Sequence, residues 1–122
     1  MIVDTLIFRE DVIDERPKDV AAFIDAWFDA LDYLKKNPDD GNTIIARNMK
    51  LIPREVAQIR QSHSVELLDL EHNRRVFDPH AANNVHQVSE KALALWRREG
   101  LAPNVPLDER LFLDDHFVTQ HP

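Results

Sequence analysis

The chain has 122 residues, of which 43% are hydrophobic and 30% are charged, and its formal net charge is −7. This length suits at most one domain with a single core, and the acidic balance argues against nucleic acids and anionic membrane surfaces, which require clustered lysine and arginine. The absence of cysteine excludes disulfides, thiolate catalysis and cysteine-based zinc sites, but it does not identify the compartment.

The first predicted element is a β-strand over residues 2–9, which are mostly apolar. It is the only predicted strand in an otherwise helical chain. A lone strand cannot satisfy its own N–H and C=O groups, so partner strands must come from elsewhere. We therefore expect the chain to be a piece of a larger fold, or to complete itself by association with a second copy.

The next predicted element is a long helix over residues 17–36. Pro17 suits its first position because the missing N–H would have no helical partner there. The helix ends before Pro38, because the residue preceding a proline avoids the α region. One apolar stripe with three-four spacing is expected to be buried, and it comprises Val20, Phe23, Ile24, Trp27, Phe28, Leu31 and Leu34.

Shorter helices complete the prediction. Pro38 and Pro53 open two of them, Asp69 is the N-cap of another, and Gly100 follows the last long helix as its C′ residue. The predicted ranges are roughly 38–49, 53–62, 69–77, 82–99 and a short 107–113. The predicted fold class is therefore mainly α, with five to six helices and one N-terminal strand in a single partial domain, 1–122.

Several segments stand in an order that is typical of one family. In this order the chain resembles the C-terminal portion of ABC-transporter substrate-binding proteins of the nitrate, taurine, sulfonate and thiamine-precursor type. The resemblance covers nearly all of the chain. It depends on the order of several segments and not on any single motif. Its segments are Phe8-Arg9-Glu10-Asp11 and residues 26–34, 37–39, 44–46, 53–56, 67–73 and 99–101, with a terminal echo in Leu113-Asp114 and Phe117-Val118.

The resemblance implies an α/β type II periplasmic binding protein fold, in which ligand binds between two lobes. The chain would be about the last third of such a protein, and most ligand contacts would lie outside it. The family is periplasmic or on the cell surface, whereas no secretory signal is visible here. No apolar run approaches the roughly 18 residues needed to cross a bilayer, so no membrane insertion is expected.

Three residues are candidate ligand contacts in the full-length context. By resemblance, Asp4 and Thr5 lie on a strand that passes the floor of the cleft; alternatively, Asp4 is an edge-strand charge that deters pairing. Arg9 could bind a small anionic or sulfonate-like ligand, because a guanidinium suits planar oxyanions. The alternative for Arg9 is a surface pair with Glu10 or Asp11.

Other chemistry is not expected. The six histidines lack the close spacing of metal ligands, and the acidic run around Glu10 and Asp14 complements a helix N-terminus. Trp27 and Trp96 fall on apolar stripes and are predicted in the core. The resemblance places the reactive residues of related enzymes outside this portion. We therefore predict no enzyme activity, no metal and no cofactor.

Two functions remain open. The first is a partial solute-binding protein of an ABC importer that does not bind ligand alone. The second is a stand-alone helical dimerisation or interaction module, or a sensor-receptor fragment, derived from that family. A homodimer through the N-terminal strand or through swapped helices is expected, because a monomer would expose strand edges and the apolar side of the first long helix.

Overall fold

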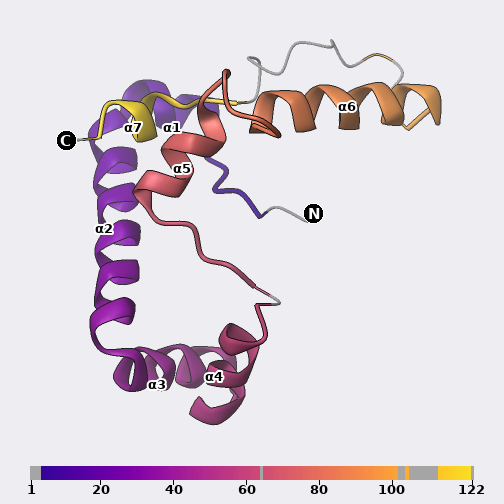
Figure 1. Cartoon of the computed structure of the whole chain (residues 1–122). Helices are drawn as coiled ribbons and strands as arrows, with labels where there is room; N and C mark the ends of the chain where they lie inside the picture. The colour runs from indigo at the N-terminus through magenta and orange to yellow at the C-terminus, as the bar shows by residue number, and fades with distance from the viewer. Residues whose placement is uncertain (1–3, 64, 102–103, 105–112, 122) are drawn as a thin grey trace. The chain divides into compact units, whose positions relative to one another are not determined.

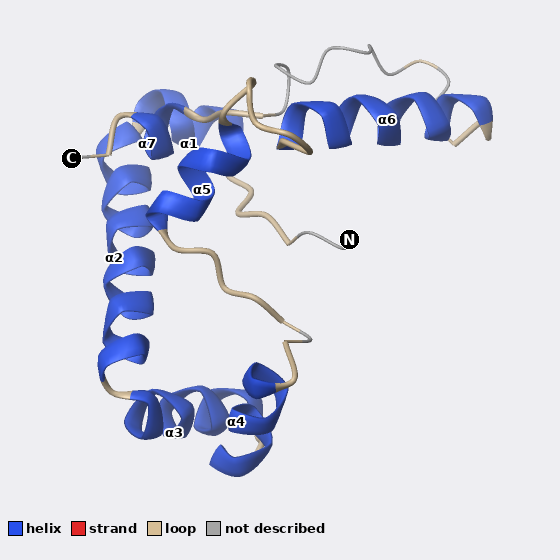
Figure 2. Cartoon of the chain, in the orientation of Figure 1, coloured by secondary structure: helices blue, strands red, loops and turns tan. Residues whose placement is uncertain are grey.

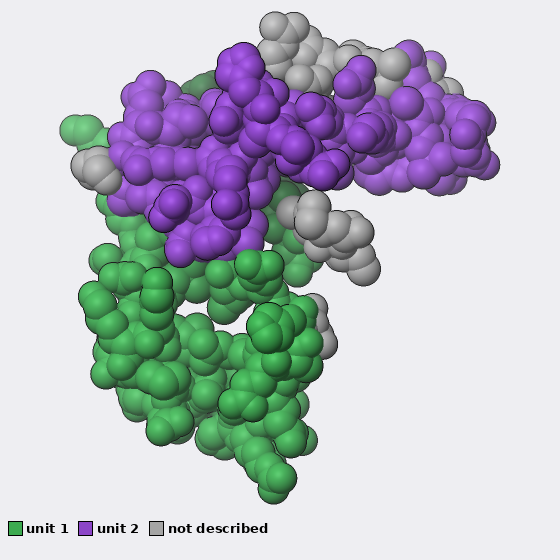
Figure 3. All heavy atoms as spheres, in the orientation of Figure 1, with its two compact units in different colours: residues 1–67 green, residues 68–122 purple. Residues whose placement is uncertain are grey.

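The computed structural model describes residues 4–63, 65–101, 104 and 113–121. These residues form seven helices (Figures 1 and 2). The mainly α prediction is confirmed. The chain divides into two compact units, Met1–Leu67 and Leu68–Pro122, which Figure 3 shows in different colours.

The predicted strand over residues 2–9 is wrong for the residues that the structure describes. Residues 4–9 belong to no strand, and the backbone groups of residues 4–8 make no hydrogen bond to another described residue. The described part of the chain offers no second strand, so no ladder forms. The segment is held at one end, where the ring of Phe8 packs edge-to-face on Phe23 with centroids 5.6 Å apart.

The first unit contains four helices: α1 (Glu10–Glu15), α2 (Pro17–Lys36), α3 (Pro38–Met49) and α4 (Pro53–Gln61). A proline opens each of the last three, at the positions that the sequence analysis expects. Helix α1 is absent from the sequence-based prediction, and it contains the acidic run that precedes the long helix. Arg16 has φ −134° and ψ 46°, and it separates α1 from α2.

The chain turns sharply between α2 and α3 at Asn37 (Figure 1). The N–H of Asn37 donates to the carbonyl of Tyr33 at 2.8 Å, and the N–H of Gly41 donates to the carbonyl of Asn37 at 2.9 Å. Gly41 is buried against Leu34, and an added Cβ would lie 2.4 Å from Leu34 Cδ1. A glycine at this position therefore permits the close approach of α3 to the end of α2.

Helices α3 and α4 pack side by side. Lys50 ends α3 in the left-handed region with φ 56°, and the N–H of Leu51 donates to the carbonyl of Ala46 at 2.9 Å, as in a Schellman motif. The carboxylate of Glu55 accepts from the N–H of Ile52 at 2.9 Å at the start of α4. With these two caps, a connection of only three residues, 50–52, joins α3 to α4.

The second unit contains α5 (Leu70–Phe77), α6 (Val85–Arg98) and the short, unpredicted α7 (His116–Thr119). Asp69 caps α5 as expected, with its side chain accepting from the N–H of His72. Helix α6 begins at residue 85 rather than 82, because Asn83 has φ 58° and the Asn84 side chain caps the helix by accepting from the N–H of Gln87. Of the predicted helix 107–113, only Leu113 is described, and it is not helical.

The apolar core of each unit is small. The buried apolar side chains among the described residues are Val20, Ile24, Leu34, Ala46 and Val56 in the first unit and Leu93 in the second. The prediction that Trp27 and Trp96 are in the core is wrong, because they are 38% and 48% exposed. A helix stripe is buried only where another element covers it. Of the seven predicted stripe residues of α2, Val20, Ile24 and Leu34 are buried and Phe28 and Leu31 are half-buried, whereas Phe23 and Trp27 are exposed. Of the described helices, none is both long and apolar enough to cross a membrane.

Candidate functional site

An apolar groove of about 640 Å³ lies within the first unit. It is formed by the carboxyl half of α2, by α3 and α4, and by the segment that follows α4. Its volume falls within the range of about 300–1,000 Å³ that is typical of ligand-binding clefts. The lining residues are Trp27, Ala30, Leu31, Tyr33, Leu34, Gly41, Ile44, Ile45, Met49, Leu51, Val56, Ile59, Arg60, Val65 and Leu67.

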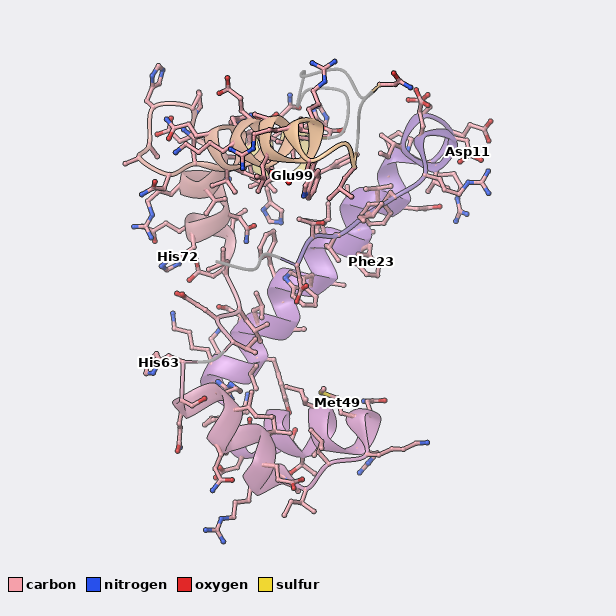
Figure 4. The ribbon with its side chains drawn as sticks, turned by 90° about the vertical axis from the view of Figure 1, so that its right-hand side faces the viewer. Asp11, Phe23, Met49, His63, His72 and Glu99 are labelled. Carbon is pink, nitrogen blue, oxygen red and sulfur yellow. The ribbon has the colours of Figure 1, made fainter. Side chains whose placement is uncertain are left out.

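Much of this lining is open to solvent. Met49, labelled at the end of α3 in Figure 4, is 62% exposed, and Ile44, Ile59, Val65 and Leu67 are also exposed. A single exposed apolar side chain is ordinary, but a contiguous group around one groove indicates a surface that contacts a partner or a ligand. The groove is therefore the best candidate site that the described residues form.

One cationic side chain, Arg60, lines the groove. Its Nη1 donates to Oδ1 of Asn42 at 2.7 Å, and the Asn42 side chain is buried between α3 and α4. Because a buried amide oxygen without a donor is costly, this bond stabilises the helix pair that forms one wall of the groove. Arg60 therefore has a structural role, because its hydrogen bond holds α4 against α3 beside the groove.

The one phenol of the lining is Tyr33. Its hydroxyl donates to the carboxylate of Asp40, which lies in the first turn of α3. The hydrogen bond and the negative charge of Asp40 raise the pKa of Tyr33 above its ordinary value. The phenol, which is protonated at neutral pH even at its ordinary pKa, serves as a hydrogen-bond donor that joins α2 to α3.

The three residues predicted to contact ligand do not line the groove. Asp4 and Thr5 are exposed on the extended segment. Arg9 is exposed and forms a bidentate pair with Asp11, with Nε–Oδ1 and Nη2–Oδ2 distances of 2.9 and 2.7 Å. This is the surface pair that the sequence analysis gave as the alternative for Arg9.

Among the residues that the structure describes, no three histidine, aspartate or glutamate side chains gather as metal ligands. A close histidine–carboxylate contact joins His72 Nδ1 and Asp69 Oδ1 at 2.6 Å, at the start of α5. Asp69 also accepts from the N–H of His72 there, so the pair belongs to the helix cap. Figure 4 labels His72 at this end of α5.

Sequence reasoning placed several groove residues on helix faces but did not bring them together. The sequence does contain a signal for an apolar surface. The segments next to α3 and α4 are themselves apolar, although both helices already have an apolar face; these segment residues are Leu51, Ile52, Val65 and Leu67. Two short helices cannot bury so many large side chains. An excess of this kind indicates an open apolar surface.

Comparison with known proteins found no relative. No protein-family model, no curated protein and no solved structure matches this chain. The function is therefore proposed from the order of the elements, the extended segment and the groove.

Proposed function

We propose that this chain is the carboxyl-terminal part of a solute-binding protein of an ABC importer, of the nitrate, sulfonate, taurine or pyrimidine-precursor class. The order of its elements supports this proposal: an extended segment, a short acidic helix and three proline-led helices separated by one to three residues. This is the order in which the sequence resembles that family. In this role the chain is not an enzyme.

The observation that carries the proposal is the extended segment of residues 4–8. Its backbone groups make no hydrogen bond to another described residue, although two of its side chains, Leu6 and Ile7, are large and apolar. An extended apolar segment of this kind is suited to join the edge of a sheet, where its N–H and C=O groups would find partners. A binding-protein lobe has such a sheet.

The open groove supports the same proposal. The exposed apolar residues of α3 and α4 form a surface that the remainder of a larger fold would cover. The solute itself would bind outside this groove. Clefts for small ligands bury most of the ligand surface, whereas much of the lining of this groove is open to solvent. The candidates Asp4, Thr5 and Arg9 are exposed on one segment, so the chain alone should not bind solute.

The test is the mass of the native product. An antibody raised against this chain is used to isolate the protein from its source cells, and the isolated protein is weighed by mass spectrometry. A product well above 14.2 kDa, recovered from the periplasmic fraction, is expected. A native product of 14.2 kDa contradicts the proposal. A calorimetric titration of the isolated chain with taurine or nitrate should show no binding. Saturable binding would contradict the expectation that the chain alone does not bind solute.

A second function is favoured by the presence of the groove and the extended segment in one unit. Under this alternative the chain is a self-associating helical module, or part of a sensor receptor, derived from the same family. The partner that covers the groove is then another copy of the chain. A homodimer is the expected form.

A further inference from the structure

We propose that the groove binds an amphipathic helix that carries a carboxylate beside its apolar stripe, and that Arg60 pairs with this carboxylate. The helix belongs to the remainder of the larger protein. This inference rests on the first proposed function, in which that remainder covers the groove. It adds the chemistry of the element that lies there.

The lining contains a cation that lacks an anionic partner. Of the described residues that line the groove, Arg60 is the only charged one. It is half-buried, and no ion pair joins it to a described carboxylate. Its hydrogen bond from Nη1 goes to the neutral amide of Asn42. The positive charge at this place is therefore not compensated within the described part of the chain.

An element that fills the groove removes water from Arg60. A guanidinium that loses its water is costly unless an anion and further hydrogen bonds replace the water. A guanidinium has five N–H donors, and the bond to Asn42 uses one of them, so donors remain for a carboxylate in a two-bond pair. A purely apolar occupant is therefore disfavoured, and a cationic one is disfavoured more strongly.

The walls of the groove favour a helix as the occupant. Most of the lining comes from α2, α3 and α4, whose backbone groups are paired within the helices, and the rest of the lining is apolar side chains. An occupant must therefore satisfy its own backbone groups, as a helix does and an extended segment does not. Side-chain ridges of one helix fit the grooves between others, and an apolar helix stripe in an open groove is a common mode of recognition.

Fluorescence anisotropy of labelled synthetic helical peptides, titrated with the 122-residue chain, tests the pairing. Each peptide has leucines at three-four spacing, and a single glutamate is placed in turn at each position that flanks this stripe. Matched peptides carry glutamine or lysine at the same position. The best glutamate peptide should bind about tenfold more tightly than its glutamine counterpart, because a hydrogen bond to a charged group is stronger than one to a neutral group. The lysine counterpart should bind most weakly.

Variants of the chain assign the preference to Arg60. Asn42→Leu combined with Arg60→Met removes the guanidinium without leaving a buried amide oxygen unpaired, and this variant should bind the glutamate and glutamine peptides equally. Arg54→Gln removes an exposed arginine of the same helix that does not line the groove, so it should keep the preference. Circular dichroism checks that each variant retains the helix content of the parent chain.

A second pair of variants locates the binding surface. Ile44→Asp places a charge in the lining and should weaken the binding of every peptide. Leu95→Asp changes an exposed leucine of α6 and should leave binding unchanged. Both leucine and isoleucine are exposed in the parent chain, so neither change removes a buried side chain.

Several results overturn the inference. They are the absence of binding by every peptide, equal binding of the glutamate and glutamine peptides by the parent chain, and a glutamate preference that persists without Arg60. A parent chain that dimerises unless Ile44 is replaced also overturns it, because a second copy then occupies the groove. These results leave the mass of the native product unaffected. A native product of 14.2 kDa contradicts the first proposed function, so the two failures are distinguishable.

Discussion

Arg60 and Asn42 are joined by a hydrogen bond of 2.7 Å from Nη1 to Oδ1, which connects α4 to α3. Asn42 is 6% exposed, so water cannot replace the lost donor if Arg60 is removed. The bond lies beside the groove that Arg60 lines. The relationship therefore couples the stability of the helix pair to the shape of the groove.

Arg60→Met should destabilise the first unit by about 1–3 kcal/mol, because the buried amide oxygen of Asn42 loses its donor. Urea unfolding followed by circular dichroism measures the change. The matched variant is Asn42→Leu combined with Arg60→Met, in which both polar partners are absent, and its cost should be clearly smaller than that of Arg60→Met alone. Equal costs would show that the bond does not stabilise the pair.

Gly41→Ala should destabilise the chain by about 1 kcal/mol, although alanine is the better helix former. The new Cβ would lie 2.4 Å from Leu34 Cδ1 and 3.3 Å from Leu34 Cα, so α3 must shift from α2. In a Leu34→Ala background the Cδ1 atom is gone and the contact with Cα remains, so the same change should cost clearly less. Urea midpoints of the four proteins in this cycle test the expectation, and an equal cost of Gly41→Ala in both backgrounds contradicts it.

Tyr33 is the only tyrosine of the chain, so its pKa is measured directly from the absorbance of tyrosinate. The hydrogen bond to Asp40 and the charge of Asp40 raise that pKa above the ordinary value of about 10. Asp40→Asn should bring it back toward the ordinary value. A raised folded-state pKa means that the contribution to stability is complete below about pH 10 and is lost as the pH rises through the folded-state pKa. Identical titrations of parent and variant would contradict this cause.

Two residues at helix ends share a left-handed backbone but differ in side chain. Lys50 follows α3 with φ 56°, and Gly100 follows α6 with φ 72°. Lys50→Gly should stabilise the chain and Gly100→Ala should destabilise it, each by about 1 kcal/mol, because a Cβ disfavours this conformation. Apart from its chain neighbours, no atom of the described residues lies within 4 Å of a Cβ at Gly100, so the cost there is conformational. Thermal unfolding that moved both variants in one direction would refute the explanation.

Local signals in the sequence were sufficient for most of the helical elements. Proline at a first helical position, an aspartate N-cap and a C′ glycine act through their own backbone and near neighbours. In the structure, helices begin at Pro17, Pro38 and Pro53, Asp69 caps α5, and Gly100 follows the end of α6 at Arg98. The start of α6 shows the limit of this reasoning. Asn83 adopts φ 58° and Asn84 becomes the cap, whereas the periodic pattern alone extended the helix to residue 82.

The helical class and the positions of the proline joints follow from local sequence, because they depend on interactions within a few residues. Which apolar faces are covered depends instead on how the elements pack. Residues 4–8 have strand-like composition but no ladder, since a ladder requires a second strand. Trp27 follows a core pattern yet lines an open groove, since burial requires an element packed on that face.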